Sequence, residues 1–418
     1  MRQTCCKFWT ILLLALLLRV VAAIAIDQHV TEAGRTFLIE GDANGYWELG
    51  QHIAAGEDYA IFQPPRRVLR TPGFPLLLAA SITVFGKSVF AAGLVMAVVG
   101  TGCCWLTWLL ARKLFDESTA LWAMLLVAVS PLQIGSNVQI LSETWFSFGL
   151  LLCLLALARL LQQLPTASCS RIAFANGILT GLTVLIRPGW ILWAGGSSIL
   201  VILFGQMTFA KRILSAALIC GGCFVALLPW AWRNHEVTGH WVFTSLWSGP
   251  SLYDGLHPDA TGGSDMSFFD QENVLSQMSE YDMNSHYKQR AIDFVVSHPR
   301  RTVELAFLKA GRYLSPSLNA AAFSGGAFSV FCVVWYFTLT VLILAGGLDL
   351  RHKLAYVGLL AGPFLQFLLV HLVFVGSIRY RLPVEFPLSI LAAHGLVALR
   401  QQWNERTRRD GELRSGVT

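Results

Sequence analysis

Charged residues are scarce in this chain, and their scarcity excludes whole classes of protein. Asp, Glu, Lys and Arg make up 13% of the 418 residues, while hydrophobic residues make up 55% and the mean hydropathy is +0.56. A soluble domain carries roughly 25% charged residues, so a soluble globular fold is excluded, and a disordered chain is excluded for the same reason. The net charge of +6 gives no indication of nucleic-acid binding. The composition predicts a polytopic membrane protein.

Several functional motifs are also missing. The nine cysteines avoid both polar stretches of the chain, which argues against a disulfide framework. There is no Walker pattern for nucleotide-driven transport and no HExxH metal motif. There is also no internal repeat of the kind found in many transporters. Cys220-Gly-Gly-Cys223 lies in an apolar run, so we interpret it as a set of small helix-packing residues.

The acidic residues that are present cluster in two segments. Seven of the 25 lie in 27–58 and ten in 236–304, which predicts two water-facing loops at about 27–87 and 232–325. The apolar run 72–86 is short and begins with prolines, so we expect an interfacial helix there. A membrane span needs about 20 apolar residues, and on this basis we predict ten spans. They are 8–26, 88–111, 119–136, 141–161, 172–186, 188–206, 212–231, 326–347, 354–376 and 383–399.

Basic residues set the predicted orientation. If the N-terminus lies in the cytoplasm, all the basic turns between spans and the basic tail at 401–418 fall on the cytoplasmic side, as the positive-inside rule requires. Both loops and the short turns at 139–142, 186–188 and 377–383 then lie on the outer face. The first apolar segment resembles a secretory signal, but Arg19 interrupts it, and we expect a retained anchor.

Two outer carboxylates are candidates for chemistry. Asp42 follows the first span, and Glu143 is the only acid between Glu117 and Glu236. A lone acid at the start of a span is a functional candidate. The alternative for both is helix capping, in which the side chain accepts a backbone N–H at a helix start.

Outer arginines are candidates for anion binding, because a guanidinium binds phosphate through two parallel hydrogen bonds. Arg70 precedes the interfacial segment, and its alternative role is attraction to lipid headgroups. Arg379 and Arg381 violate the positive-inside trend in a short turn, which an outer anionic ligand or pairing with Glu385 or loop acids would explain. The remaining candidates are Arg187 and Arg233, and Arg233 alternatively extends to the membrane interface.

These pieces occur together, in order, in one family. The chain resembles the GT-C membrane glycosyltransferases, in particular the dolichyl-phosphate-mannose protein mannosyltransferase-like group. The resemblance covers about residues 8–400. Its motifs are Asp42-Ala43 with Tyr46 and Gly56, Arg70-Thr71-Pro72-Gly73-Phe74-Pro75, Ser142-Glu143, Ile186-Arg187-Pro188, Pro229-Trp230 with Arg233-Asn234, and Arg379-Tyr380-Arg381-Leu382-Pro383.

The resemblance implies an all-α GT-C-like fold with one domain over 1–400, and the basic residues of 401–418 predict a cytoplasmic tail. It implies a glycosyltransferase that moves a hexose or pentose from a polyprenyl-phosphate donor, with Asp42 as the catalytic carboxylate and Glu143 as a second acid. Tyr46 and the five arginines are the expected substrate-binding residues. The acceptor is a protein, a lipid or a polysaccharide, and the enzyme acts on the outer face of the plasma or inner membrane.

One departure from the family concerns metal binding. Many relatives carry two adjacent acids where this chain has Asp42-Ala43, so no cofactor is firmly implied and a divalent cation stays an open option.

The alternative function is a lipid-linked-sugar flippase or another transporter, which should place charges near the middle of the spans. The main mid-span charge is Arg19, which we expect to extend toward the outer interface. A non-catalytic scaffold is the third option.

Overall fold

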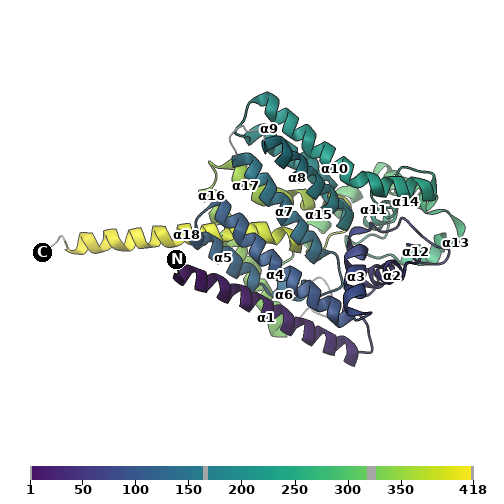
Figure 1. Ribbon diagram of the computed structural model, residues 1–418, viewed down its shortest axis with the longest axis horizontal. Helices are drawn as coiled ribbons and strands as arrows, with labels where there is room; N and C mark the ends of the chain where they lie inside the picture. Colours follow the sequence, from purple (N-terminus) through teal and green to yellow (C-terminus); the bar gives the residue numbers. More distant parts are fainter. Residues whose placement is uncertain (1, 163–167, 318–325, 416–418) are drawn as a thin grey trace.

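The structure is a computed structural model that describes residues 2–162, 168–317 and 326–415 (Figure 1). Its regular elements there are helices, and the only strand-like feature in those ranges is an isolated bridge between Ile61 and Arg66. The prediction of an all-α membrane fold is confirmed.

Eight helices in the described ranges are long and apolar enough to cross a membrane. They are α1 (Arg2–Glu32), α4 (Val89–Leu114), α7 (Glu143–Gln162), α8 (Ser168–Ile186), α10 (Phe209–Thr238), α16 (Gly326–Asp349), α17 (Leu354–Val373) and α18 (Ile378–Ser415). Three further apolar helices are shorter: α3 (Gly73–Phe85), α5 (Glu117–Ala128), and α9 (Leu192–Phe204) together with the 3₁₀ turn η1 (Pro188–Ile191).

Two of the ten predicted spans are therefore built from short helices. The segment 119–136 divides into α5 and α6 (Pro131–Ser136), because a proline at the start of α6 has no N–H to continue the preceding helix. The segment 188–206 is η1 followed by α9. The count of ten spans stays a prediction, while helix α3 agrees with the helix expected at 72–86.

Arg19 stabilises the broken segment from inside the bundle. Its side chain is fully buried, and it donates hydrogen bonds to the carbonyls of Val127 (3.2 Å) and Ala128 (3.3 Å) and to Asn137 Oδ1 (3.1 Å). The last carbonyls of a helix have no partners within it, and they carry the negative end of its dipole. The expectation that Arg19 extends toward the interface is wrong, because these carbonyls at the end of α5 hold it within the protein.

Small residues bring α8 and α10 close together. A Cβ added at Gly181 would lie 2.6 Å from Ala226 Cβ, and one added at Gly177 would lie 2.9 Å from Gly222 Cα. Bulkier residues at these positions would separate the two helices. Cys220 and Cys223 form no disulfide, and the interpretation of this segment as a helix-packing surface agrees with the structure.

The loop helices gather at one end of the molecule, opposite both termini (Figure 1). These helices are α2 (Asp42–Ala55), α3, α11 (Ser248–Gly255), α12 (Ser267–Glu272), α13 (Val274–Gln277) and α14 (Glu280–Ser297), and α15 (Pro299–Tyr313) leads from them back to the bundle. At the other end α18 extends well beyond the body of the protein and carries the predicted basic tail. This arrangement is the one expected if both loops lie on one side and both termini on the other.

Candidate active site

A cavity of about 350 Å³ lies where the loop helices meet the ends of the long helices. Its volume is in the range of small-ligand sites. Helix α2, the segment before α3, and helix α11 form its loop side, while the ends of α8, α17 and α18 form its membrane side. The charged side chains in its lining are Asp42, Arg70, Arg187, Asp254 and Arg379.

Asp42 is the first residue of α2, and its carboxylate binds two arginines from distant parts of the chain. Oδ1 accepts a hydrogen bond from Arg70 Nη2 at 2.7 Å, and Oδ2 accepts one from Arg379 Nη1 at 2.8 Å. The N-cap position belongs to Gly41, at φ 79°, and no side chain caps the helix. Asp42 therefore does not cap α2, and its carboxylate points to the cavity.

The two arginines also keep Asp42 ionised. Burial alone would raise the pKa of the carboxyl group, but the adjacent guanidinium groups of Arg70 and Arg379 outweigh burial and hold the pKa well below its ordinary value. The side chain is 34% exposed, so the carboxylate is open to a ligand.

Glu143 begins α7 and lies deeper, with 4% of its side chain exposed. Its Oε1 accepts a hydrogen bond from Arg379 Nε and forms an ion pair with Arg187 Nη1 at 3.0 Å. Glu143 itself is not part of the cavity lining, whereas its neighbour Ser142 is. Its carboxylate therefore fixes two cavity arginines in place.

Three arginines and two carboxylates form one connected cluster, which leaves one positive charge in excess. Arg70 and Arg187 lie at its ends, and Arg379 bridges the two acids. Aromatic rings support both ends of the cluster. The guanidinium carbon of Arg70 lies 4.8 Å from the ring centroid of Tyr46. The guanidinium carbon of Arg187 lies 5.0 Å from the ring centroid of Tyr380.

A close helix contact brings the two end arginines to the same cavity. Arg70 lies three residues before Gly73, which begins α3, and Arg187 follows the end of α8. A Cβ added at Gly73 would lie 2.6 Å from the carbonyl oxygen of Leu185 and 2.8 Å from the backbone nitrogen of Ile186. A residue without a side chain is therefore needed at Gly73 for α3 to approach α8 this closely.

Two predicted binding residues lie outside the cavity. Arg233 donates to the carbonyl of Arg67 at 2.6 Å and lies 5.4 Å from the ring centroid of Tyr59, so it supports the loop that precedes Arg70. Arg381 is 1% exposed and donates to the carbonyls of Tyr313 and Ser315.

The expected outer turn over 377–383 differs from the structure, because α18 already begins at Ile378. The alternative of pairing with Glu385 applies to Arg381, whose Nε lies 2.7 Å from that carboxylate. Arg379 pairs with the loop acid Asp42 instead. The two arginines therefore have different surroundings, and only Arg379 lines the cavity.

One carboxylate of the cavity, Asp254, was not among the residues predicted from the sequence. It is one of ten acids in its loop and belongs to no motif. The available signal was its spacing, since Ser248, Ser251 and Asp254 recur every three residues and so lie on one side of a helix.

The acids of the cluster are also the candidate ligands for a metal ion. In the described ranges no three His, Cys, Asp or Glu side chains come together in a way that could hold one. Guanidinium groups contact both oxygens of Asp42 and one oxygen of Glu143. This arrangement does not fit a divalent cation between the two acids.

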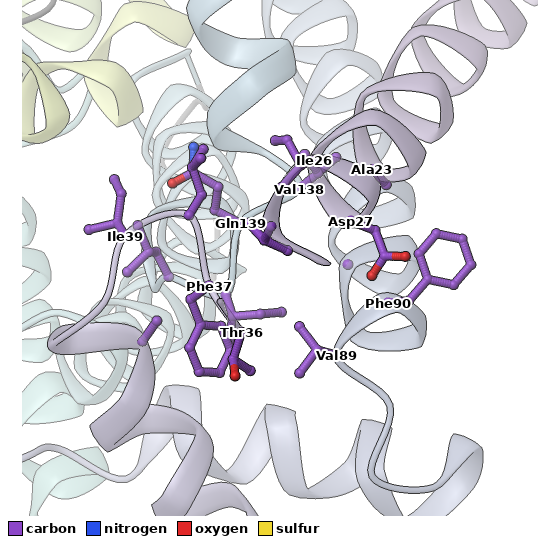
Figure 2. A pocket seen from close by; sticks show the side chains of 16 residues that line it. Ala23, Ile26, Asp27, Thr36, Phe37, Ile39, Val89, Phe90, Val138 and Gln139 are labelled. Atoms are coloured by element: carbon purple, nitrogen blue, oxygen red, sulfur yellow. The ribbon is translucent and has the colours of Figure 1, made fainter. Parts of the chain in front are cut away.

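A second cleft lies between the end of α1, the start of α4 and the segments 36–39 and 138–141 (Figure 2). Its volume is about 40 Å³ and its lining is mostly apolar, with Asp27 and Gln139 among the exceptions. This space accepts water rather than a sugar. Ala43 is part of its lining, so the cleft adjoins the start of α2 without sharing the arginine cluster.

One protein family matches part of this chain. Residues 69–232 match the sequence profile of the family described as dolichyl-phosphate-mannose-protein mannosyltransferase. The matched region contains Arg70, Glu143 and Arg187. A search of curated proteins by sequence gives no significant match.

Solved structures match nearly the whole chain. The oligosaccharyltransferase AglB from Archaeoglobus fulgidus, in complex with an inhibitory peptide and a dolichol-phosphate, superposes with a TM-score of 0.60 at 14% identity, over 97% of this chain and 52% of that one. The Archaeoglobus fulgidus oligosaccharyltransferase in complex with Zn and sulfate gives 0.57 at 15% identity, over 95% and 50%. ArnT from Cupriavidus metallidurans, bound to undecaprenyl phosphate, gives 0.47 at 15% identity, over 93% and 77%.

The fold is therefore that of these oligosaccharyltransferase structures, and the family match over residues 69–232 agrees with the resemblance that the motifs predict. The chain spans about half the length of the oligosaccharyltransferase structures that it matches.

Proposed function

We propose that this protein transfers a sugar from a polyprenyl-phosphate donor to an acceptor hydroxyl at the membrane surface. The observation that carries the proposal is the cavity in which the ionised Asp42 lies within an arginine cluster of excess positive charge. An anionic group attracted to this cluster would lie beside a carboxylate that can accept a proton. The family match over residues 69–232 supports the same reaction class.

An apolar groove next to the cavity supports a lipid-linked donor. The groove has a volume of about 650 Å³ and lies between α9 and α17. Gly196, Gly358 and Gly362 are part of its lining, and Val370 and Phe374 line both the groove and the cavity. A polyprenyl chain in the groove would bring its phosphate to the arginines while its hydrocarbon stays in an apolar environment.

The cluster matches the charge change of this reaction. The acceptor oxygen forms a bond to C1 of the sugar, the bond between C1 and the phosphate oxygen breaks, and the acceptor proton passes to Asp42. The phosphate begins as a diester with one negative charge and leaves as a monoester with two. Arg70, Arg187 and Arg379 stabilise the charge that develops on the leaving group, so no strong general acid is required. Attack opposite the leaving group would invert the configuration at C1.

Glu143 has a positioning role in this proposal. Its buried carboxylate holds Arg187 and Arg379 at fixed orientations but does not line the cavity. Tyr46 supports Arg70 in the same way through its ring. The catalytic carboxylate is therefore Asp42 alone.

The predicted orientation puts this cavity on the outer face of the plasma or inner membrane, where the acceptor would be a protein, a lipid or a polysaccharide. The reaction is tested with purified protein in vesicles that contain a polyprenyl-phosphate sugar. A transferase releases polyprenyl phosphate in proportion to the glycosylated acceptor, whereas a flippase moves the lipid across the bilayer without breaking it. Comparing envelope glycans with and without the gene by mass spectrometry would identify the acceptor.

A further inference from the structure

One wall of the cavity is rich in hydroxyl groups that the arginine cluster does not use. Helix α11 presents Ser248, Ser251 and Asp254 to the cavity, at a spacing of three residues. The flanking segments add further hydroxyls to the lining, which are those of Thr244, Ser245 and Ser264.

Asp254 is the one acidic side chain on this wall. It is 3% exposed, and burial raises the pKa of its carboxyl group. Its Oδ2 accepts a hydrogen bond from Ser264 Oγ at 2.7 Å, and its Oδ1 accepts one from the backbone N–H of Asp265 at 2.8 Å. No ion pair of Asp254 occurs in the described ranges. A carboxylate oxygen accepts two hydrogen bonds, so each oxygen keeps one acceptor position.

The hydroxyl wall begins beside the arginine cluster. Trp247 directly precedes α11 and lines the cavity, and its ring centroid lies 6.0 Å from the guanidinium carbon of Arg70. From Ser248 to Asp254 the helix rises about 9 Å. This length accommodates one sugar ring adjacent to a phosphate held at Arg70.

We propose that Asp254 and the hydroxyls of α11 bind the donor's sugar ring and determine which sugar is accepted. The inference rests on the proposed function, because it assumes a sugar joined to the phosphate at the arginine cluster. Asp254 accepts hydrogen bonds from two hydroxyls of the ring, or from a hydroxyl and an amino group. A site built around such bonds discriminates strongly against a sugar that lacks them, since its buried polar groups are then left without partners.

The test compares two lipids on the same variants, with binding measured in detergent micelles. The probes are polyprenyl phosphate and polyprenyl-phosphate hexose. Asp254→Asn should preserve the fold, because the Ser264 hydroxyl can accept the new amide N–H and Oδ1 still accepts the Asp265 N–H. Asp259→Asn is the matched control, because Asp259 is exposed in the same loop and does not line the cavity.

We expect Asp254→Asn to bind polyprenyl phosphate as the wild type does and to bind the hexose lipid about 10–100-fold more weakly, the range for one hydrogen bond to a charged group. Ser251→Ala should show a smaller loss of the same kind. If Asp254→Asn keeps the wild-type ratio of the two affinities, Asp254 does not bind the sugar and the inference is wrong. If the wild-type protein binds neither lipid, the proposed function fails and this inference fails with it, an outcome distinct from the preceding one.

Discussion

Replacing Asp42 with Asn tests the proposed reaction most directly. Asn keeps the shape of the side chain but cannot accept the acceptor's proton. Its amide oxygen still accepts from one of the two arginines, while its NH₂ group faces the other. One charge-assisted hydrogen bond is lost from a side chain that is 34% exposed, so we expect the free energy of unfolding to fall by about 1–2 kcal/mol. A fold stabilised by about 5–15 kcal/mol tolerates this change.

Transfer should respond far more strongly than stability. A general base contributes about 10²–10⁴-fold, so Asp42→Asn should lower the rate of sugar transfer by at least about 10²-fold. Asp42→Glu keeps the carboxylate in a shifted position and should retain partial activity. The assay is transfer from a polyprenyl-phosphate sugar in purified membranes, alongside a thermal-unfolding measurement. Glu48→Gln is the control, since Glu48 is exposed on the same helix and lies outside the cavity lining.

The pH profile provides a second test of Asp42. Its pKa lies well below the ordinary value of 3.8 because of Arg70 and Arg379, so the carboxylate stays ionised as the pH falls from 7 to 5. Transfer should therefore show no acid limb from Asp42 in this range. The stability that this ionisation contributes is present above the unfolded-state pKa, and it is lost only as the pH falls further through the folded-state pKa. Full activity of Asp42→Asn, or an acid limb near pH 6 that this variant abolishes, would refute the assignment.

Three further predictions concern the cluster and its support. Replacing Arg379 with Ala should lower kcat/KM for the lipid donor by an amount equivalent to about 1.5–3 kcal/mol. Lys should restore only part of this loss, because one ammonium cannot bridge Asp42 and Glu143 as the planar guanidinium does. An unchanged donor dependence would make Arg379 a structural charge. Adding a chelator should leave the transfer rate unchanged, because the arginines already neutralise the two acids; loss of activity that a divalent cation restores would contradict this. Replacing Arg19 with Met leaves the last carbonyls of α5 without their hydrogen-bond donor. The thermal unfolding temperature should therefore fall, while the folded protein keeps its transfer rate. An unaltered unfolding temperature would show that Arg19 does not stabilise α5.

Most of the fold could be predicted from the sequence because membrane spans depend on local composition. The long apolar runs match the long helices, and the acid-rich segments match the loop helices at one end of the molecule. The exceptions are local too. A proline at 131 divides one predicted span into α5 and α6, and hydropathy alone does not register this break.

The arginine cluster was only partly predictable, because its pairs join distant parts of the chain. Arg379 lies 337 residues from Asp42 and 236 from Glu143. Charge patterning identified each of these residues by its exceptional position, but it could not say which cation binds which acid. The close approach at Gly73 that brings Arg70 toward Arg187 is likewise a contact between separate helices.

The different roles of Arg379 and Arg381 could not be predicted, because a turn was expected from the sequence where the structure has a helix. If the segment is a turn, both side chains can contact one outer ligand. Because α18 begins at Ile378, both lie on a helix, where successive residues rotate by about 100° and residues two apart point to nearly opposite sides. Arg379 therefore points to Asp42 and the cavity, while Arg381 points to the carbonyls at the end of α15. The same geometry explains why two neighbouring exceptions to the predicted charge distribution have different surroundings: Arg379 lines the cavity, and Arg381 joins α18 to the end of α15.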